Sequence, residues 1–347
     1  MHFPIRVGIA GFGYVAGVFH VPLLLANPDY RIVKVFERTA ERSRKLCPEA
    51  EIVRSLDGLI GPDVDLAIIL TPNAEHYGMA KSALGAGRHV IVDKPITILP
   101  SETEELADIA RKQGVLLSVF QNRRWDAGHL TAKRIIASGL LGATANYEAH
   151  FDRYAPQPNR RLWKEGEDIG VSILYDLGTH LADQAVDMFG LPEGVYADLC
   201  AQRSGMKRVD YCQIILYYPG LKVVLSMGQL VREPGPQLSI HGQLGSYVKH
   251  GLDRQEALLA AGVVPVGAWS AEPESAWGIL NAEAGSVHFR GPVESIPGDY
   301  PAYYRNIRDA LAGKAELLVT PDQCLDVLRL LAAARESAAS GQRIAFR

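Results

Sequence analysis

The chain has 347 residues, of which 48% are hydrophobic and 22% charged, and its 36 basic and 39 acidic side chains leave a formal net charge of −3. At roughly 150 residues per domain, this length predicts two domains, and the apolar content excludes disordered, collagen-like and disulfide-stapled chains. The balanced charge, without long blocks of one sign, excludes a nucleic-acid footprint and electrostatic binding to a membrane.

The amino terminus and the cysteines indicate where the protein works. No apolar run approaches the ~20 residues that span a bilayer, and the first residues do not have the pattern of a signal peptide. The cysteines lie far apart without a Cys-x-x-Cys pattern, which predicts reduced thiols rather than zinc ligands or disulfides; they are Cys47, Cys200, Cys212 and Cys324. We therefore expect a cytoplasmic protein that binds no metal.

Apolar, β-branched runs alternate with helix-like stretches in the first third of the chain. Nearly continuous hydrophobic strands separated by helices are typical of an α/β fold with a doubly wound parallel sheet. We expect Ser101 and Glu104 to form a capping box for one helix, and Pro22 to end or kink an earlier one. The expected strands are residues 5–10, 31–36, 64–70, 89–92 and 116–120, and the expected helices are residues 40–46, 76–86 and 101–113.

The pattern changes after about Arg124, where strands follow one another with few helices between them. Such a run predicts a large, mostly antiparallel open sheet in a second domain of the α+β type. The expected strands are residues 145–152, 195–203, 211–218, 222–230, 237–241 and 246–249, with helices at 128–138, 174–189, 303–312 and 322–340 and short strands and loops over 262–301. We therefore predict one domain over residues 1–124 and another over residues 125–347.

A glycine-rich motif follows the first expected strand and opens a helix. It reads Gly11-Phe12-Gly13-Tyr14-Val15-Ala16 and so contains G-x-G-x-x-A. Gly11 permits a tight turn, Gly13 lets a pyrophosphate approach the backbone, and Ala16 keeps the helix close to the strand. The N–H groups and the positive dipole end of the helix attract phosphates. The motif predicts a Rossmann domain that binds a dinucleotide.

The end of the second expected strand carries the residues that bear on the choice between NAD and NADP. Glu37 stands 24 residues after Gly13, near the position where a carboxylate accepts hydrogen bonds from ribose hydroxyls and repels a 2′-phosphate. This position favours NAD. Arg38 and Arg42 would bind a 2′-phosphate if the Glu37 side chain turned away, and an ordinary solvated strand end is a further alternative, so the preference stays open.

Two further motifs stand where a nicotinamide would bind. Thr71-Pro72-Asn73-x-x-His76 follows the strand at 64–70, and Asp93-Lys94-Pro95 follows the strand at 89–92. Ligands of an open parallel sheet bind beyond the carboxyl ends of its strands, so we expect both motifs to contact the cofactor. The alternative for Lys94 is an ordinary surface charge.

These three motifs, in this order and spacing, resemble the Gfo/Idh/MocA oxidoreductase family. The resemblance implies a Rossmann domain joined to a C-terminal α/β domain with a large open sheet. Glu37 departs from what NADP-dependent members are expected to carry there, so NADP dependence is not carried over. Further segments resemble the branch of the family that contains the NADP-dependent scyllo-inositol dehydrogenases; they are residues 121–126, 150–154, 174–184, 240–242, 245–249 and 300–304.

Asp176 and His180 are the candidate catalytic pair. In a regular α-helix their spacing places them on one face, one turn apart. Oxidation of a secondary alcohol needs a base for the hydroxyl proton, and histidine suits this task at neutral pH. Family members place such an Asp and His, with the lysine of an [ED]-K-P motif, around the reacting hydroxyl. The resemblance therefore implies that His180 is the general acid/base and that Lys94 and Asp176 bind and polarise the substrate. From the residues alone, a helix-surface pair is the alternative.

Four other side chains are candidates for the substrate site. Arg123 and Trp125 follow the last strand of the first domain, and Asp152 and Tyr154 stand at the polar end of a later strand. Each has an ordinary structural role as its alternative. The neighbouring Arg124 is expected either to line the same cleft or to pair with Asp126.

Together these features predict an NAD(P)-dependent dehydrogenase that acts on a secondary alcohol of a cyclic polyol or sugar, with inositol as the best single substrate. The alternatives are a dehydrogenase or reductase of another sugar or anhydrosugar, and a non-catalytic dinucleotide-binding regulator of the same fold. Lys94, Asp176 and His180 favour an enzyme, because a regulator needs no proton acceptor. The resemblance also implies a homodimer or homotetramer, and no nucleic-acid or membrane partner is expected.

Overall fold

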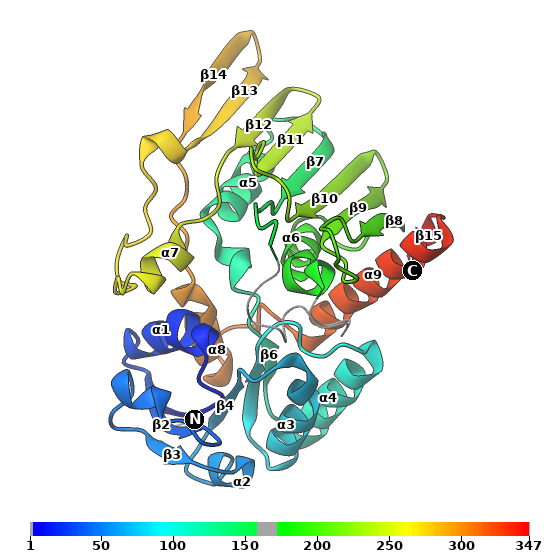
Figure 1. The fold of residues 1–347 in the computed structure, drawn as a ribbon. Coiled ribbons are helices and arrows are strands. Elements are labelled where there is room, and N and C mark those ends of the chain that lie inside the picture. The colour runs from blue at the N-terminus through cyan, green and yellow to red at the C-terminus, as the bar shows by residue number, and fades with distance from the viewer. Residues whose placement is uncertain (1–2, 158–171, 347) are drawn as a thin grey trace. The chain divides into compact units, whose positions relative to one another are not determined.

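The computed structural model describes residues 3–157 and 172–346, and the chain forms two compact units (Figure 1). The first unit comprises Met1–Asn122 with two later segments, Gln255–Ser270 and Asp299–Leu325. The second unit comprises the remaining segments, which are Arg123–Arg254, Ala271–Gly298 and Asp326–Arg347. The boundary predicted after residue 124 assumes a single cut along the chain and stays a prediction.

The first unit is built on a six-stranded parallel sheet with the strand order β3-β2-β1-β4-β5-β6. This order, which changes direction between β1 and β4, is that of the Rossmann fold and confirms the predicted doubly wound sheet. The short β3 escaped prediction because its three residues show no hydrophobic run. The strands are β1 (Ile5–Ala10), β2 (Tyr30–Phe36), β3 (Glu51–Val53), β4 (Leu66–Ile69), β5 (His89–Val92) and β6 (Leu117–Val119).

Two expectations for the helices of the first unit are wrong, and the kink expected at Pro22 stays a prediction. The expected helix at 40–46 is a single 3-10 turn, η2 (Arg42–Lys45). The expected capping box is wrong, because α4 (Pro100–Gln113) begins at Pro100 and no side chain caps it. Next to Pro22, the helix after β1 changes from a π turn, η1 (Ala16–His20), to α1 (Val21–Leu25). The remaining helices are α2 (Leu56–Leu59), α3 (Asn73–Gly85), α7 (Gln255–Ala260) and α8 (Pro301–Leu311).

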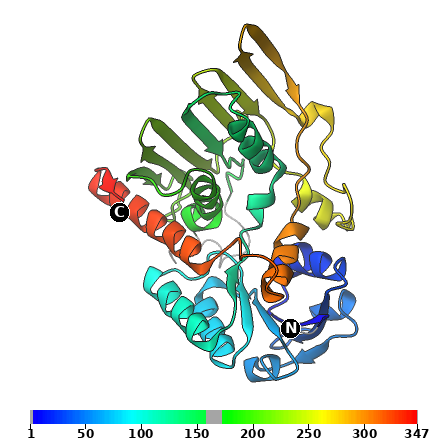
Figure 2. The same ribbon diagram turned by 180° about the vertical axis from the view of Figure 1, so that it is seen from behind.

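The second unit contains a nine-stranded sheet in the order β14-β13-β12-β11-β7-β10-β9-β8-β15, seen from behind in Figure 2. Among the pairings of the described strands, only β7–β10 is parallel, so the predicted mostly antiparallel open sheet is confirmed. The strands are β7 (Thr144–His150), β8 (Gly194–Cys200), β9 (Tyr211–Tyr218), β10 (Leu221–Gly228), β11 (Leu238–Gly242), β12 (Gly245–Lys249), β13 (Gly278–Ala284), β14 (Val287–Val293) and β15 (Ile344–Ala345).

The helices of the second unit include the segment that carries the candidate catalytic pair. A π turn, η6 (Leu174–Gly178), and the following α6 (Thr179–Phe189) pack on β10, where a Cβ on Gly178 would lie 3.3 Å from the Met227 sulfur. Glycine at this position therefore lets the helix approach the sheet closely. The other helices are η3 (Asn122–Trp125), α5 (Ala127–Ala137), η7 (Glu274–Ala276) and α9 (Pro321–Ser340), of which η3 and α9 run across the boundary between the units.

Membrane-spanning helices and metal-binding clusters are the two further features to consider in the described residues. Over residues 3–157 and 172–346, every helix is too short or too polar to cross a bilayer. The same residues contain no cluster of three or more His, Cys, Asp or Glu side chains that could hold a metal ion.

Candidate functional site

The glycine-rich turn after β1 has the shape that a phosphate group needs. Gly11 has a φ of +89°, and a Cβ there would lie 3.1 Å from the Leu70 carbonyl oxygen, so only glycine fits without strain. A Cβ on Gly13 would meet no heavy atom within 4 Å, which leaves space beside the backbone. Ala16 is fully buried, as close helix–strand packing requires. This shape supports, without testing, the predicted cofactor contacts of residues 11–16.

The parallel sheet brings the three predicted motifs to one edge. Ala10 at the end of β1 is in register with Ile69 of β4, and Ile69 is in register with Val92 of β5. The glycine turn, the Thr71-Pro72 segment and the Asp93-Lys94-Pro95 segment follow these three strands at spacings of about 4.8 Å per strand. Segments far apart in the sequence therefore share the edge where ligands of such sheets bind.

His76 joins two of these motifs. It lies in α3 and is 1% exposed, with Nδ1 2.9 Å from the Pro95 carbonyl oxygen and Nε2 2.8 Å from the Thr71 carbonyl oxygen. Carbonyl oxygens only accept, so both contacts are hydrogen bonds when the ring carries both protons. This geometry gives His76 a positioning role for the two loops, and its predicted contact with the cofactor stays a prediction.

The residues around Lys94 are held by local contacts. The Lys94 backbone N–H donates to Asp93 Oδ1 at 2.9 Å, and the Lys94–Pro95 peptide bond is cis. On the neighbouring loop, Pro72 occupies the N-cap position of α3, which begins at Asn73, without a side-chain cap hydrogen bond. Lys94 itself is half-buried. The cofactor and substrate roles predicted for both loops stay predictions.

Glu37 at the end of β2 turns inward. Its Oε1 accepts the Arg42 backbone N–H at 2.9 Å, and its Oε2 accepts the backbone N–H and the hydroxyl of Ser43 at 3.1 and 2.6 Å. The residue is 6% exposed, whereas Arg38 and Arg42 are exposed. The predicted preference for NAD assumed that the Glu37 carboxylate faces the cofactor ribose. In the structure the Glu37 side chain turns away, as in the alternative geometry considered for Arg38 and Arg42.

Asp176 and His180 lie on either side of the junction between η6 and α6. The Asp176 backbone N–H donates to the Ser172 carbonyl oxygen at 2.9 Å as the helix begins. The segment begins as a π turn where a regular α-helix was expected, and the stacking of the two side chains on one face stays a prediction. Asp176 is exposed and His180 is buried. Single π turns within helices are frequent at functional sites, and the catalytic roles of the pair stay predictions.

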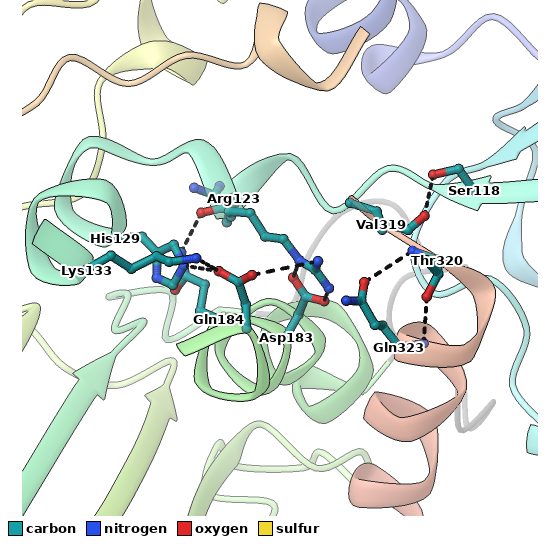
Figure 3. Close-up of polar contacts among 11 residues, drawn as sticks. Ser118, Arg123, His129, Lys133, Asp183, Gln184, Val319, Thr320 and Gln323 are labelled. Atoms are coloured by element: carbon teal, nitrogen blue, oxygen red, sulfur yellow. Dashed lines mark hydrogen bonds and ion pairs between the residues drawn. The ribbon is translucent and has the colours of Figure 1, made fainter. Parts of the chain in front are cut away.

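A buried ion-pair cluster anchors α6 within the second unit (Figure 3). The Asp183 carboxylate accepts two hydrogen bonds from Arg124, at 2.8 Å from Nε and 2.7 Å from Nη2, and both residues are buried. One turn later, Asp187 contacts His129 Nε2 at 2.7 Å and Lys133 Nζ at 2.8 Å, both from α5. Burial alone would raise the pKa of Asp187, but the hydrogen bonds from His129 and Lys133 hold it well below its usual value.

The residues around Arg123 extend this anchor. Gln184 Nε2 donates to the Arg123 carbonyl oxygen at 2.6 Å. Arg123 itself pairs with Asp126 at 3.3 Å, whereas Arg124 pairs with Asp183 and not with the Asp126 that the alternative gave it. Two sets of hydrogen bonds therefore join the middle of α6 to the η3 segment, and their residues on α6, Asp183 and Gln184, follow His180 by three and four positions.

The other predicted substrate residues fall into one region of the second unit. Phe151 has the Arg123 guanidinium 4.8 Å from its ring centre, and the adjacent Asp152 contacts His150 Nδ1 at 3.1 Å. This hydrogen bond raises the pKa of His150. Tyr154 is half exposed, with the Arg232 guanidinium 5.0 Å from its ring centre. Trp125 is buried, and the substrate roles of Arg123, Trp125, Asp152 and Tyr154 stay predictions.

The sequence analysis did not identify the buried residues that anchor α6 beside the candidate site, although it identified candidate residues for ligand contact. Asp183 and Asp187 lie one helical turn apart, and so do His129 and Lys133. Opposite charges at this spacing on two expected helices are the sequence signal from which their pairing could have been predicted. For Arg124, whose partner lies 59 residues away, the sequence carries no local signal.

Comparison with known proteins covers nearly the whole chain. Residues 5–121 match a family model described as an oxidoreductase family with an NAD-binding Rossmann fold, and residues 133–346 match the C-terminal alpha/beta domain of an oxidoreductase family. The chain is 40% identical to the uncharacterized oxidoreductase YdgJ of Escherichia coli, over 96% of each protein. It is 38% identical to the scyllo-inositol 2-dehydrogenase (NADP(+)) IolW of Bacillus subtilis, over 96% of this chain and 93% of IolW.

The fold gives the same result. A solved structure of the oxidoreductase yvaA from Bacillus subtilis, described as putative, superposes with a TM-score of 0.96 at 37% identity over 99% of both chains. The same family is indicated by this superposition, by the two family matches and by the glycine turn at the shared sheet edge. The chain therefore belongs to the Gfo/Idh/MocA family of NAD(P)-binding oxidoreductases.

Proposed function

We propose that the protein oxidises a secondary alcohol of a cyclic polyol or sugar to the ketone and catalyses the reverse reduction, with an inositol as the substrate. The observation that carries the proposal is the shared edge of β1, β4 and β5, where the phosphate-binding turn follows β1 and Lys94 follows β5, with β4 alone between the two strands. A dinucleotide whose phosphates lie on the turn has its nicotinamide along this edge. The similarity to IolW over nearly the whole chain supports the substrate class.

Three side chains supply what alcohol oxidation needs besides the dinucleotide, and we propose that they act on one hydroxyl. A bound nicotinamide supplies the hydride acceptor or donor. His180 takes the hydroxyl proton during oxidation and returns it during reduction. Lys94 donates a hydrogen bond to the reacting oxygen and stabilises the negative charge that develops on it. Asp176, which is exposed on its π turn, accepts a hydrogen bond from a neighbouring hydroxyl and so orients the ring.

The runner-up within this chemistry is another sugar or an anhydrosugar, and a panel of substrates separates the two. Reduction of NAD and NADP would be followed by absorbance with inositols, aldoses and anhydrosugars as substrates. We expect turnover to be highest with an inositol. A higher kcat/KM for an aldose or anhydrosugar than for every inositol would overturn the substrate assignment.

A non-catalytic regulator of the same fold is the other rival, and point variants decide it. We expect His180→Ala and Lys94→Ala to bind the dinucleotide normally and to lose most turnover, about a hundredfold or more for a general base. The matched control is His241→Ala, because His241 is an exposed histidine on β11 whose ring contacts the Ser246 hydroxyl at 2.9 Å. Turnover by His180→Ala at the wild-type rate would contradict the role given to His180.

We also propose that the protein works in the cytoplasm as a homodimer or homotetramer. Light scattering after size exclusion measures the mass directly. A single species of the mass of one chain would refute the assembly.

A further inference from the structure

The chain that follows β7 is held by backbone hydrogen bonds to the end of β10 and the residues after it. The Phe151 backbone N–H donates to the Ser226 carbonyl oxygen at 2.9 Å, and the Arg153 backbone N–H donates to the Gly228 carbonyl oxygen at 2.9 Å. The Arg153 carbonyl oxygen in turn accepts the Val231 backbone N–H at 3.0 Å. Both backbone groups of Arg153 are therefore paired, which fixes the point from which its side chain starts.

The Arg153 guanidinium lies over the ring of Phe151, which is buried. Its central carbon is 5.2 Å from the ring centre, and the guanidinium carbon of Arg123 is 4.8 Å from the same ring centre. The two guanidinium carbons are therefore no more than about 10 Å apart, which is the sum of these two distances. A guanidinium that lies over a ring keeps the N–H donors along its edge for an anion.

The acidic side chains of this region are paired elsewhere. Asp126 pairs with Arg123 at 3.3 Å, and the Asp152 carboxylate contacts His150 Nδ1 at 3.1 Å. Successive residues of an extended chain point to opposite faces, so Asp152 and Arg153 diverge. Arg153 is exposed, and within the residues that the structure describes no carboxylate forms an ion pair with it. Its donors therefore remain available to an anion from solution.

Arg153 lies on the face of the sheet that carries the candidate catalytic segment. The parallel register of β7 and β10 places Phe151 beside Met227 on one face. On that face, a Cβ on Gly178 of η6 would lie 3.3 Å from the Met227 sulfur. Arg153 follows Phe151 by two residues and points to the same face. The Arg153 side chain and the turn that carries Asp176 therefore lie over neighbouring strands, which are about 4.8 Å apart.

We propose that Arg153 binds an acidic group of the substrate, so that the polyol or sugar oxidised at the candidate site carries a carboxylate or a phosphate. A guanidinium matches either anion with two parallel N–H···O hydrogen bonds. The Phe151 ring restrains the guanidinium, and Arg123 on the same ring adds a second positive charge. The inference rests on the proposed function for the reaction, and it adds an acidic substituent to the inositol or sugar ring proposed there.

Matched pairs of neutral and acidic substrates test the inference. The pairs are D-glucose with D-glucuronate, D-glucose with D-glucose 6-phosphate, and myo-inositol with a myo-inositol monophosphate. In at least one pair, we expect the acidic member to have a kcat/KM about tenfold or more above that of the neutral member, since a hydrogen bond to a charged group is worth this much. The glucuronate pair reports on a carboxylate and the other two pairs on a phosphate.

The outcomes separate this inference from the proposed function. Turnover with a kcat/KM ratio of acidic to neutral member near or below one in every pair overturns the inference and leaves the proposed function standing. If no compound is turned over, the proposed function fails, and calorimetric binding of the same pairs to the protein saturated with NADH or NADPH gives the comparison instead. Equal affinity for the two members of every pair then overturns the inference as well.

Variants of Arg153 assign the preference to this side chain. Arg153→Ala should lower kcat/KM for the acidic member about tenfold and bring the ratio of acidic to neutral member near one. Arg153→Lys should keep part of the ratio, because lysine retains the charge but not the two-donor edge. Since Arg153 is exposed, the wild-type ratio should also fall as the salt concentration rises.

Arg290→Ala is the matched control and should keep the wild-type ratio. Arg290 is an exposed arginine on β14, which stands four strands from β7 in the sheet and so roughly 19 Å away at the usual strand spacing. An Arg153→Ala variant that loses kcat/KM equally for both members of a pair would show a merely structural role and overturn the inference.

Discussion

Replacement of Asp183 by asparagine should destabilise the second unit strongly, because it leaves Arg124 buried without its main partner. The two residues share two hydrogen bonds of 2.8 and 2.7 Å, and their side chains are 5% and 2% exposed. Breaking one partner of a buried pair costs about 3–5 kcal/mol. Asp187 remains 3.9 Å from Arg124, which compensates part of the charge, so we expect the lower end of this range. The expected loss of about 3 kcal/mol changes the unfolding equilibrium more than a hundredfold.

Guanidinium unfolding followed by circular dichroism measures this loss. The midpoint should fall while the slope m stays constant, because the same surface is exposed on unfolding. The control is Asp108→Asn, since Asp108 and Arg111 form an ion pair on α4 with side chains 56% and 63% exposed, and such pairs contribute less than about 1 kcal/mol. The double variant Arg124→Met with Asp183→Leu should recover most of the stability, because both charges leave the core together. A loss for Asp183→Asn no greater than that of the control would refute the reasoning.

Three further outcomes follow from the described geometry. Gly13→Ala should keep wild-type stability but lose about tenfold or more in dinucleotide affinity. Gly11→Ala should in addition lose about 1 kcal/mol or more of stability, because of these two glycines only Gly11 has a positive φ. Equal thermal stability of the two variants speaks against this. His76→Ala should destabilise the first unit by about 1–3 kcal/mol and lower kcat/KM, because it removes the contacts that hold the Thr71 and Pro95 loops together. A variant with reduced stability but unchanged kcat/KM would show that His76 has a purely structural role. The folded pKa of Asp187 is depressed, so its contribution to stability is present above the unfolded pKa of about 3.9 and is lost as the pH falls below that value. The stability difference between wild type and Asp187→Asn should therefore shrink below about pH 4. A difference that stays constant from pH 7 to pH 3 contradicts this expectation.

The Rossmann sheet could be predicted because its strands carry their own signal. All residues of β4 are buried, and a strand buried on both faces appears in the sequence as a continuous hydrophobic run. Gly11 was likewise predictable, because only glycine adopts its backbone conformation at the required place. The edge shared by the three motifs follows from parallel topology alone.

The remaining features depend on contacts between distant residues, which local patterns do not encode. Whether Glu37 faces a ribose or the protein depends on Ser43 and on the support of Arg54, and neither is visible in the strand-end pattern. The π turn at Asp176 breaks a periodicity that the sequence leaves looking regular. Residues 255–270 and 299–325 join the first unit, and composition does not tell which core a late segment enters.

The most direct test of the account is a double-mutant cycle on turnover with Lys94→Ala, His180→Ala and the combined variant, at saturating dinucleotide and with the best polyol substrate. Residues that act on one hydroxyl are strongly non-additive, so the combined variant should turn over about as slowly as the slower single variant. Losses that multiply, or a His180→Ala variant as fast as the wild type, would contradict the claim that the two side chains act together on the reacting alcohol.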